Sequence, residues 1–142
     1  MTEPDEPPRF FLDRGLGSVF VPEGLREHGW QVTTMDERYG ADVSQDVADI
    51  DWIREATELG ESLITKDTAI ARVPVEAQVV HMCDARVFTI TSARITGSQM
   101  LERLLDNEQT VFRWARRTPA PFVLGIYESR TARILLNYPP KP

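Results

Sequence analysis

The amino-acid sequence predicts an α/β fold with a mainly parallel central sheet and a hairpin at its C-terminal edge. Short apolar and β-branched stretches alternate with longer stretches whose apolar residues recur at helical spacing. Glycine or proline ends several of the helical stretches, as expected of βα units. The last two apolar stretches, 122–127 and 131–136, are separated only by Glu128, Ser129 and Arg130. We therefore expect these two strands to pair antiparallel around a tight turn.

The first half of the chain predicts three strands and two amphipathic helices. The strands are expected at 10–12, 31–34 and 62–65, and the helices at about 18–28 and 45–59. Residues 35–44 are polar, so we expect a loop there that is a candidate lid. Asp13 directly follows the first strand, and Asp67 follows the third strand by two residues.

The second half predicts two short helices, a strand, a long helix and the hairpin. The short helices are expected at 68–72 and 76–82, and the strand at 86–90. One long helix is expected from Ser98 to just before Pro119, because its apolar residues keep helical spacing throughout. Basic residues in its last turns complement the helix dipole and form either a solvated face or a path for a nucleic-acid backbone: Arg113, Arg116 and Arg117.

The composition is that of an ordinary globular domain. The chain has 142 residues, 42% of them hydrophobic and 27% charged. Residues 1–8 are acidic and rich in proline, so we expect a short disordered leader followed by a single domain over 9–142. The single cysteine, Cys83, excludes an intramolecular disulfide and suits a reducing cytoplasm. No apolar run reaches the length that crosses a membrane, so we expect a cytoplasmic protein without membrane contact.

Charge is distributed unequally along the chain. The net charge is −6, which taken alone argues against a nucleic-acid partner. Residues 1–85, however, hold 7 basic and 18 acidic residues, whereas residues 86–142 hold 9 basic and 4 acidic residues. This asymmetry is expected of an acidic site with a separate basic binding face. It is also compatible with ordinary solvated faces, because the two halves interleave in a doubly wound fold.

Three acidic residues are candidates for a shared metal site. Asp13 and Asp67 follow parallel strands, and Asp49 lies in the first turns of the helix at 45–59. In a doubly wound parallel sheet, such positions converge on the carboxyl edge, where ligands bind. Clustered carboxylates repel one another unless a hard divalent cation neutralises them, and Mg²⁺ or Mn²⁺ so held supports phosphodiester hydrolysis. Taken singly, each acid is equally typical of a helix cap or a turn.

Neighbouring residues extend this candidate site. Thr65 could hydrogen-bond a carboxylate or a metal-bound water, and Lys66 or Arg14 could contact a phosphate. Asp84 is a candidate fourth acid, although an aspartate directly before a strand is also a common turn residue. The second ligand is left open among three residues of the same segment: Asp46, Asp49 and Asp51.

Three sequence segments resemble PIN-like domains, and among these the VapC-type toxins of bacterial toxin–antitoxin pairs. The segments are Phe11-Leu12-Asp13, then Asp49-x-x-Trp52-Ile53-x-x-Ala56 followed by Gly60, and Leu63-Ile64-Thr65-Lys66-Asp67. The resemblance covers about residues 9–90. It implies a three-layer α/β/α fold, an Mg²⁺- or Mn²⁺-dependent endoribonuclease, and metal-ligand roles for Asp13, Asp49 and Asp67. It further implies an RNA substrate, frequent homodimers and a cognate antitoxin that holds the enzyme inactive.

Three features depart from the family pattern, and two alternatives are kept open. The second acid is often Glu in classical members, and here it is Asp49. The family usually has a fourth acid near the later strands, for which only Asp84 offers itself, and the hairpin after residue 120 is not part of the core pattern. One alternative is a receiver-like module that accepts a phosphoryl group on Asp67. The other is a non-catalytic PIN-like module that acts through protein binding. We expect a toxin endoribonuclease in preference to both.

Overall fold

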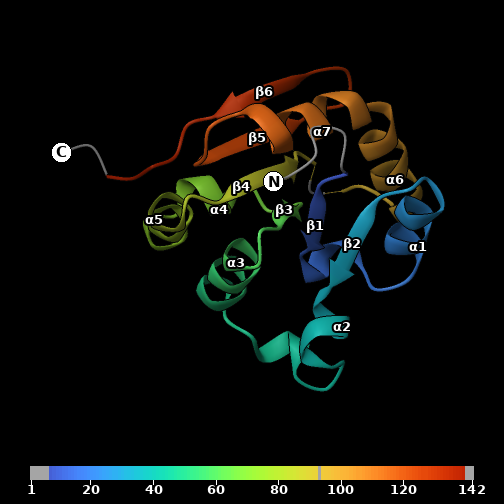
Figure 1. Cartoon of the computed structure of the whole chain (residues 1–142), viewed down its shortest axis with the longest axis horizontal. Coiled ribbons are helices and arrows are strands. Elements are labelled where there is room, and N and C mark those ends of the chain that lie inside the picture. Colours follow the sequence, from blue (N-terminus) through green and yellow to red (C-terminus); the bar gives the residue numbers. More distant parts are fainter. Residues whose placement is uncertain (1–6, 93, 140–142) are drawn as a thin grey trace.

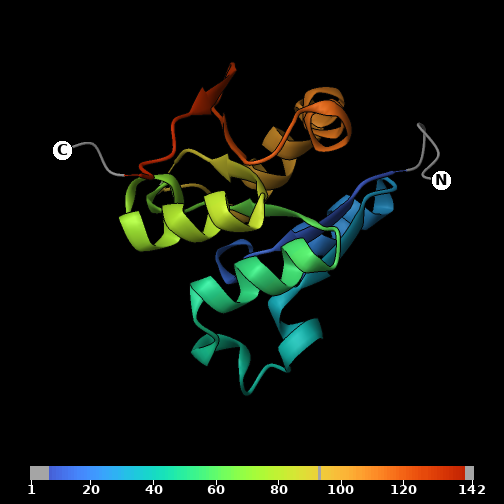
Figure 2. The same cartoon turned by 60° about the vertical axis from the view of Figure 1, so that its left-hand side comes forward.

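The computed structural model describes residues 7–92 and 94–139, and it contains a twisted six-stranded sheet with helices on both faces (Figures 1 and 2). The strand order is β2-β1-β3-β4-β5-β6, in which β6 alone pairs antiparallel, with β5. The strands are β1 (Arg9–Leu12), β2 (Gln31–Thr34), β3 (Ser62–Thr65), β4 (Arg86–Ile90), β5 (Phe122–Ile126) and β6 (Thr131–Ile134). The predicted α/β class, parallel sheet and terminal hairpin are confirmed.

The connections between strands contain seven described α-helices and two short 3-10 helices. They are η1 (Arg14–Leu16), α1 (Phe20–Glu27), α2 (Met35–Tyr39), η2 (Ser44–Asp46), α3 (Asp49–Glu58), α4 (Ala69–Arg72), α5 (Pro74–Cys83), α6 (Gly97–Asp106) and α7 (Glu108–Arg117). Helices α1, α6 and α7 cover one face of the sheet, and α3, α4 and α5 cover the other (Figure 1). No helix in the described ranges is long and apolar enough to cross a membrane.

The alternation of side chains along the strands divides the core into two layers. Phe10 belongs to the cluster under α1, α6 and α7, whereas its neighbour Phe11 belongs to the cluster under α3, α4 and α5. Ile64 and Leu63 divide in the same way on β3. Successive side chains of a strand point to opposite faces, so a strand buried on both faces must be apolar throughout. This requirement explains the unbroken apolar runs in the sequence.

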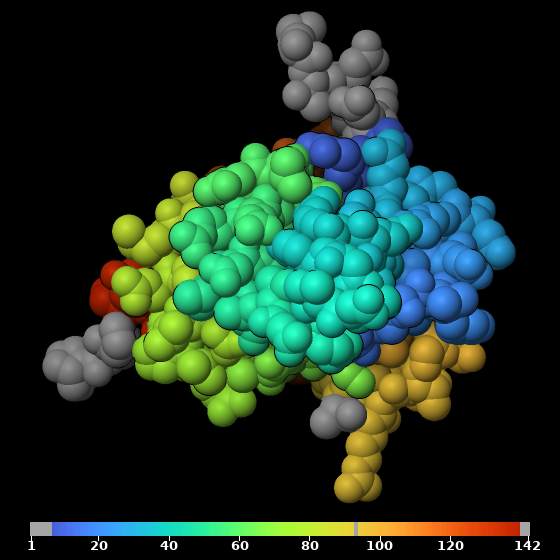
Figure 3. All heavy atoms as spheres, turned by 90° about the horizontal axis from the view of Figure 1, so that it is seen from below, coloured from blue at the N-terminus to red at the C-terminus, as the bar shows by residue number. Residues whose placement is uncertain are grey.

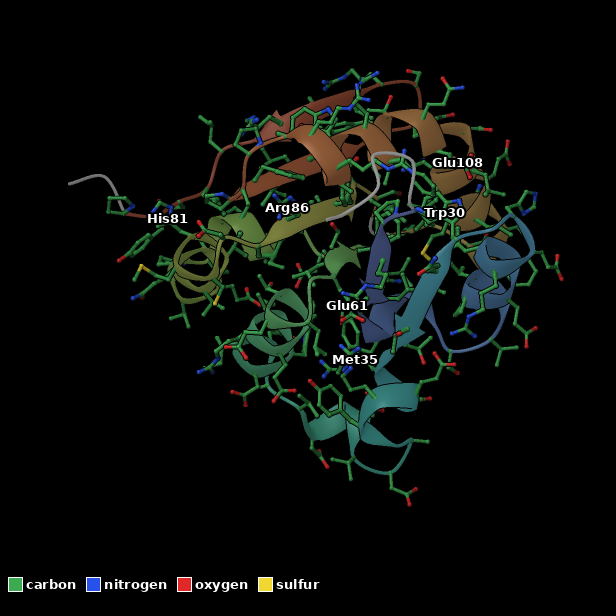
Figure 4. The ribbon with its side chains drawn as sticks, viewed as in Figure 1. Trp30, Met35, Glu61, His81, Arg86 and Glu108 are labelled. Carbon is green, nitrogen blue, oxygen red and sulfur yellow. The ribbon has the colours of Figure 1, made fainter. Side chains whose placement is uncertain are left out.

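Aromatic side chains pack α7 against β1 and against the residue that precedes β2. Trp30 is buried between Phe10 and Phe112, with ring centroids 5.0 Å from each. Its indole N–H donates a 2.6 Å hydrogen bond to Glu108, at the start of α7 (Figure 4). A buried indole needs such a partner, and Glu108 supplies it from a segment 78 residues away.

The predicted loop over 35–44 is wrong, because this segment contains α2 and the start of η2. Thr34 caps α2 by accepting from the Glu37 N–H, while the Glu37 side chain accepts from the Thr34 N–H. This capping box is visible in the sequence as Thr-x-x-Glu. The segment forms the part of the surface that is coloured cyan in Figure 3.

An ion pair fixes α2 to the body of the protein, which argues against a freely moving lid. The Arg38 guanidinium donates to both carboxylate oxygens of Glu61, over 2.6 and 2.7 Å, and lies 4.6 Å from the Phe11 ring centroid. The Glu61 side chain is only 4% exposed, and its carboxylate raises the pKa of Arg38. A two-pronged pair with so little solvent contact holds one geometry.

The other differences are in the bounds of elements. The strands expected at 122–127 and 131–136 end at Ile126 and Ile134, and several helices also differ. The single helix expected from Ser98 is two helices, because the chain breaks at Asn107, whose side-chain amide donates to the Arg103 carbonyl. Such local bonding by asparagine competes with helix continuation. The helix expected over 45–59 begins only at Asp49, after the 3-10 turn η2. The predicted leader falls mostly on residues 1–6, which lie outside the described residues.

We predict that Glu61→Ala lowers the free energy of unfolding by about 3 kcal/mol, because it leaves the Arg38 charge without its buried partner. Urea unfolding followed by tryptophan fluorescence measures the change. The control is Arg54→Ala, which removes a half-exposed pair with Asp51 and should change stability by less than about 0.5 kcal/mol. Equal effects of the two substitutions would contradict a structural role for the Arg38–Glu61 pair.

Candidate active site

The carboxyl ends of β1 and β3 lie side by side where the chain reverses its direction of winding. From β1 the chain passes to β2 on one side, and β3 then pairs with the other side of β1. Asp13 follows β1, and its N–H donates to the carbonyl of Ile64 on β3, over 2.9 Å. Asp67 follows β3. The two acids therefore share the edge at which parallel α/β sheets bind ligands.

Thr65 connects these two acidic segments. Its side chain is 1% exposed, and its hydroxyl donates to Asp13 Oδ2 over 2.8 Å. The same hydroxyl oxygen accepts from the Asp67 N–H over 3.1 Å. Asp67 Oδ1 in turn accepts from the Ala69 N–H, which places its carboxylate at the start of α4. One buried hydroxyl thus fixes the Asp13 carboxylate and the backbone at Asp67 together.

Asp49 is the first residue of α3, and two side chains hold its carboxylate. The Trp52 indole N–H donates to Asp49 Oδ1 over 2.9 Å, and Arg14 Nη1 lies 3.6 Å from the same oxygen. Asp51 instead pairs with Arg54 on the exposed side of α3, and Asp46 is exposed in η2. Among the three candidates for the second ligand, Asp49 is the one turned toward the other acids.

Arg14 has a different environment from the one expected. Its Nη2 donates to the carbonyls of Ser44 and Val47, over 3.0 and 2.7 Å, in addition to its proximity to Asp49. It therefore braces the segment that leads into α3, and these contacts do not support the expected phosphate contact. Lys66 lies over the turn after β1, where a Cβ on Gly15 would be 3.3 Å from the Lys66 side chain.

Glu76 is an acid of this edge that the sequence reasoning missed. It is half-buried in the first turn of α5. Burial, a hydrogen bond with Asp49, and the charges of Asp49, Asp67 and Asp13 together raise the pKa of Glu76 to about 7. Its interaction with all three predicted acids places it among them. The sequence feature that could have indicated Glu76 is its position two residues after Pro74, because proline is typical of the first turn of a helix.

Asp84, the acid proposed from sequence as a fourth member, does not join this group. It is exposed at the C-terminal end of α5, in the left-handed conformation with φ of 58°. Ala85 and then β4 follow it directly, so Asp84 lies at the amino edge of the sheet. The carboxyl edge carries the other four acids, and Asp84 has the alternative role of a turn residue.

The acids of this edge disfavour one another's charged forms, although Arg14 offers a positive charge to Asp49 and Asp13. Burial raises the pKa of Asp13, and the Asp49 charge raises it further, although the hydrogen bonds from Thr65 and the Arg14 N–H oppose both effects. Within residues 7–92 and 94–139, no three His, Cys, Asp or Glu side chains are already arranged to hold one metal ion. The four carboxylates are thus close enough to interact without enclosing a common point.

Comparison with known proteins places the chain in a family. The family described as "PIN like domain" matches residues 8–92, which include all four acids. A protein from Mycobacterium tuberculosis named "Putative ribonuclease VapC45" is 38% identical over 125 residues, covering 88% of this chain and 90% of the relative. No solved structure gives a significant match. The fold, the acids at its carboxyl edge and the length of these matches agree, and the chain belongs to the PIN-like domain family.

Proposed function

We propose that this protein is a divalent-metal-dependent endoribonuclease and the toxin of a toxin–antitoxin pair. The observation that carries the proposal is the meeting of four carboxylates from separate segments at one sheet edge, with the pKa of Glu76 raised to about 7 by burial and by the other three. The similarity to a relative named as a VapC ribonuclease supports RNA as the substrate. The receiver-like alternative is not favoured, because the family match covers the segments on which it was based.

The chemistry of the side chains at this edge fits Mg²⁺ or Mn²⁺. Asp13, Asp49, Asp67 and Glu76 offer only carboxylate oxygens, which are the donors that these hard cations prefer. Among the described residues, no three such side chains are already arranged around one point, so the protein offers an incomplete set of ligands. Mg²⁺ usually keeps several waters in protein sites, so this arrangement suits it.

The bound ion would supply activation of a water molecule and compensation of the negative charge on the leaving oxygen. The protein's own residues hold the carboxylates in place for it. Thr65 fixes one oxygen of Asp13, and the Trp52 indole fixes one oxygen of Asp49. Lys66, between Thr65 and Asp67, is the cation of this edge that we assign to a substrate phosphate, since Arg14 is engaged with backbone carbonyls.

The remaining assignments follow from the similarity to the VapC relative. We propose a cognate antitoxin as the protein partner and the cytoplasm as the location. The expected homodimer remains a prediction, which the mass of the protein in solution will test.

We predict that Asp67→Asn lowers RNA cleavage at least 100-fold and abolishes Mn²⁺ binding, because it removes a full negative charge from the site. Calorimetric titration with Mn²⁺ and a cleavage assay on structured RNA measure the two effects. The matched control is Asp84→Asn, the same substitution at the opposite sheet edge, which should change neither. Full cleavage by the Asp67 variant would contradict the proposed function.

We also predict that Glu76→Gln stabilises the protein in EDTA while reducing its stabilisation by Mn²⁺. The substitution removes a charge that faces three other carboxylates. The loss of this repulsion stabilises the folded state by about 1 kcal/mol, which raises the Tm by about 3 °C. Thermal unfolding at pH 8, with EDTA or with Mn²⁺, gives both quantities without reference to activity. Glu102→Gln on the exposed side of α6 is the control, and it should show neither change. A lower Tm of the Glu76 variant in EDTA would mean that the four carboxylates do not repel one another.

A further inference from the structure

Five exposed arginines lie on α7 and on the adjacent C-terminal hairpin. We refer to them as the arginine face: Arg113, Arg116, Arg117, Arg130 and Arg133. Helix α7 and strand β6 lie next to each other along the upper side of the molecule in Figure 1. The Arg133 guanidinium is 5.0 Å from the Trp114 ring centroid, which joins the hairpin to the helix directly. The arginine face is therefore continuous across two elements.

The stretch of sequence that carries the arginine face is strongly basic. Between residues 109 and 139 the sequence has five arginines and one acid, Glu128. Glu108, just before this range, accepts a 2.6 Å hydrogen bond from the Trp30 indole and is half-buried. The segment that carries the face thus has a strong excess of positive charge, and such a surface attracts polyanions.

Three of the arginines lie over aromatic rings, among them Arg116, whose guanidinium is 5.6 Å from the Phe112 ring centroid. The Arg130 guanidinium lies 4.2 Å from the Tyr127 ring centroid, and Arg133 stacks on Trp114 as described above. Stacking orders the long side chain, and a planar guanidinium keeps its N–H donors available for phosphate oxygens. The rings themselves are surfaces on which unpaired bases can stack.

The known structural uses of surface arginines account for parts of this face. Arg116 and Arg117 complement the dipole at the C-terminal end of α7, and Arg133 protects an edge strand from pairing with another chain. Neither use requires Arg113, in the middle of the helix, or Arg130, in the hairpin turn. A shared ligand with several negative charges accounts for all five.

The position of the face relative to the four acids suggests which ligand this is. Tyr127 follows β5, so the stacked pair Tyr127–Arg130 lies at the same carboxyl edge of the sheet as Asp13 and Asp67. The acidic edge repels a polyanionic substrate where no metal ion neutralises it, so a cationic surface beside that edge adds to the binding free energy. A single strand that crosses the acids can continue to Arg130 and along the hairpin.

We propose that the arginine face binds the phosphate backbone of single-stranded RNA outside the cleavage site. The inference rests on the proposed function, since it assigns to this face the substrate of the four-acid site. An acidic protein segment would satisfy the charge, but it makes no use of the half-buried aromatic rings or of the shared sheet edge. The face contributes affinity without sequence preference, because phosphate contacts are the same for every base.

The test compares Arg113→Gln/Arg133→Gln with the charge-matched control Arg26→Gln/Arg54→Gln, whose arginines lie on α1 and α3. Anisotropy of a fluorescein-labelled oligouridylate in EDTA measures binding without cleavage, between about 50 and 200 mM KCl. We expect about tenfold weaker binding near physiological salt and a log–log salt slope reduced by about 1.4, from two lost phosphate contacts to a single strand. Arg113→Lys/Arg133→Lys should retain most of the binding, and thermal unfolding checks that every variant is folded.

Three results would overturn the proposal. The first is an unchanged RNA affinity and salt slope in Arg113→Gln/Arg133→Gln, and the second is an equal loss of RNA binding in the control variant. The third is that Arg113→Gln/Arg133→Gln loses binding to polyglutamate but keeps its binding to RNA, which would indicate an acidic protein ligand. Cleavage by the wild type with Mn²⁺, measured in parallel, separates this proposal from the nuclease itself. A wild type that binds RNA through the face but never cleaves it would contradict the nuclease and leave the face standing.

Discussion

The parallel pairing of β1 with β3 is the constraint on which the site depends. It places Asp13 against Ile64 and brings the Thr65 hydroxyl within 2.8 Å of the Asp13 carboxylate. Asp67 is then held through its N–H by that same hydroxyl. Asp13 directly follows β1, Thr65 ends β3, and Asp67 lies two residues beyond that end, so the core sets the positions of all three. A shift of one residue in the register of β3 would turn Thr65 to the other face of the sheet.

The site works against the stability of the fold that holds it. Burial and the neighbouring carboxylates raise the pKa values of both Asp13 and Glu76, which means that the charged forms are disfavoured in the folded protein. A core apolar on both faces of the sheet tolerates this local loss. Residues packed for stability alone would not place an acid in the first turn of α5, where it faces three others. The loss of stability is therefore consistent with selection for cation binding.

The sequence predicted the strands better than the site. Strands 31–34, 62–65 and 86–90 match the structure, because buried strands must be apolar and their ends are marked by turn residues. Asp13 and Asp67 follow from those strands. Glu76 did not, because its place depends on how α5 packs against α3. Asp84 was predicted as a fourth acid because it is close to β4 in the sequence. An aspartate that precedes a parallel strand, however, lies at the opposite edge of the sheet from an aspartate that follows one. The structural role of Arg14 could not be predicted, because its partners are backbone carbonyls of a segment distant in sequence.

The unequal charge of the two halves has a spatial counterpart. Four acids of the first half meet at the sheet edge after β1 and β3, and five arginines of the second half lie on α7 and the hairpin. The strands of the two halves do not interleave as expected from the sequence, because β4, β5 and β6 extend the sheet on one side only. An enzyme that concentrates negative charge where it binds a metal must attract a polyanion by another surface. The order of the strands places the acidic site and the arginine face at different parts of a single sheet.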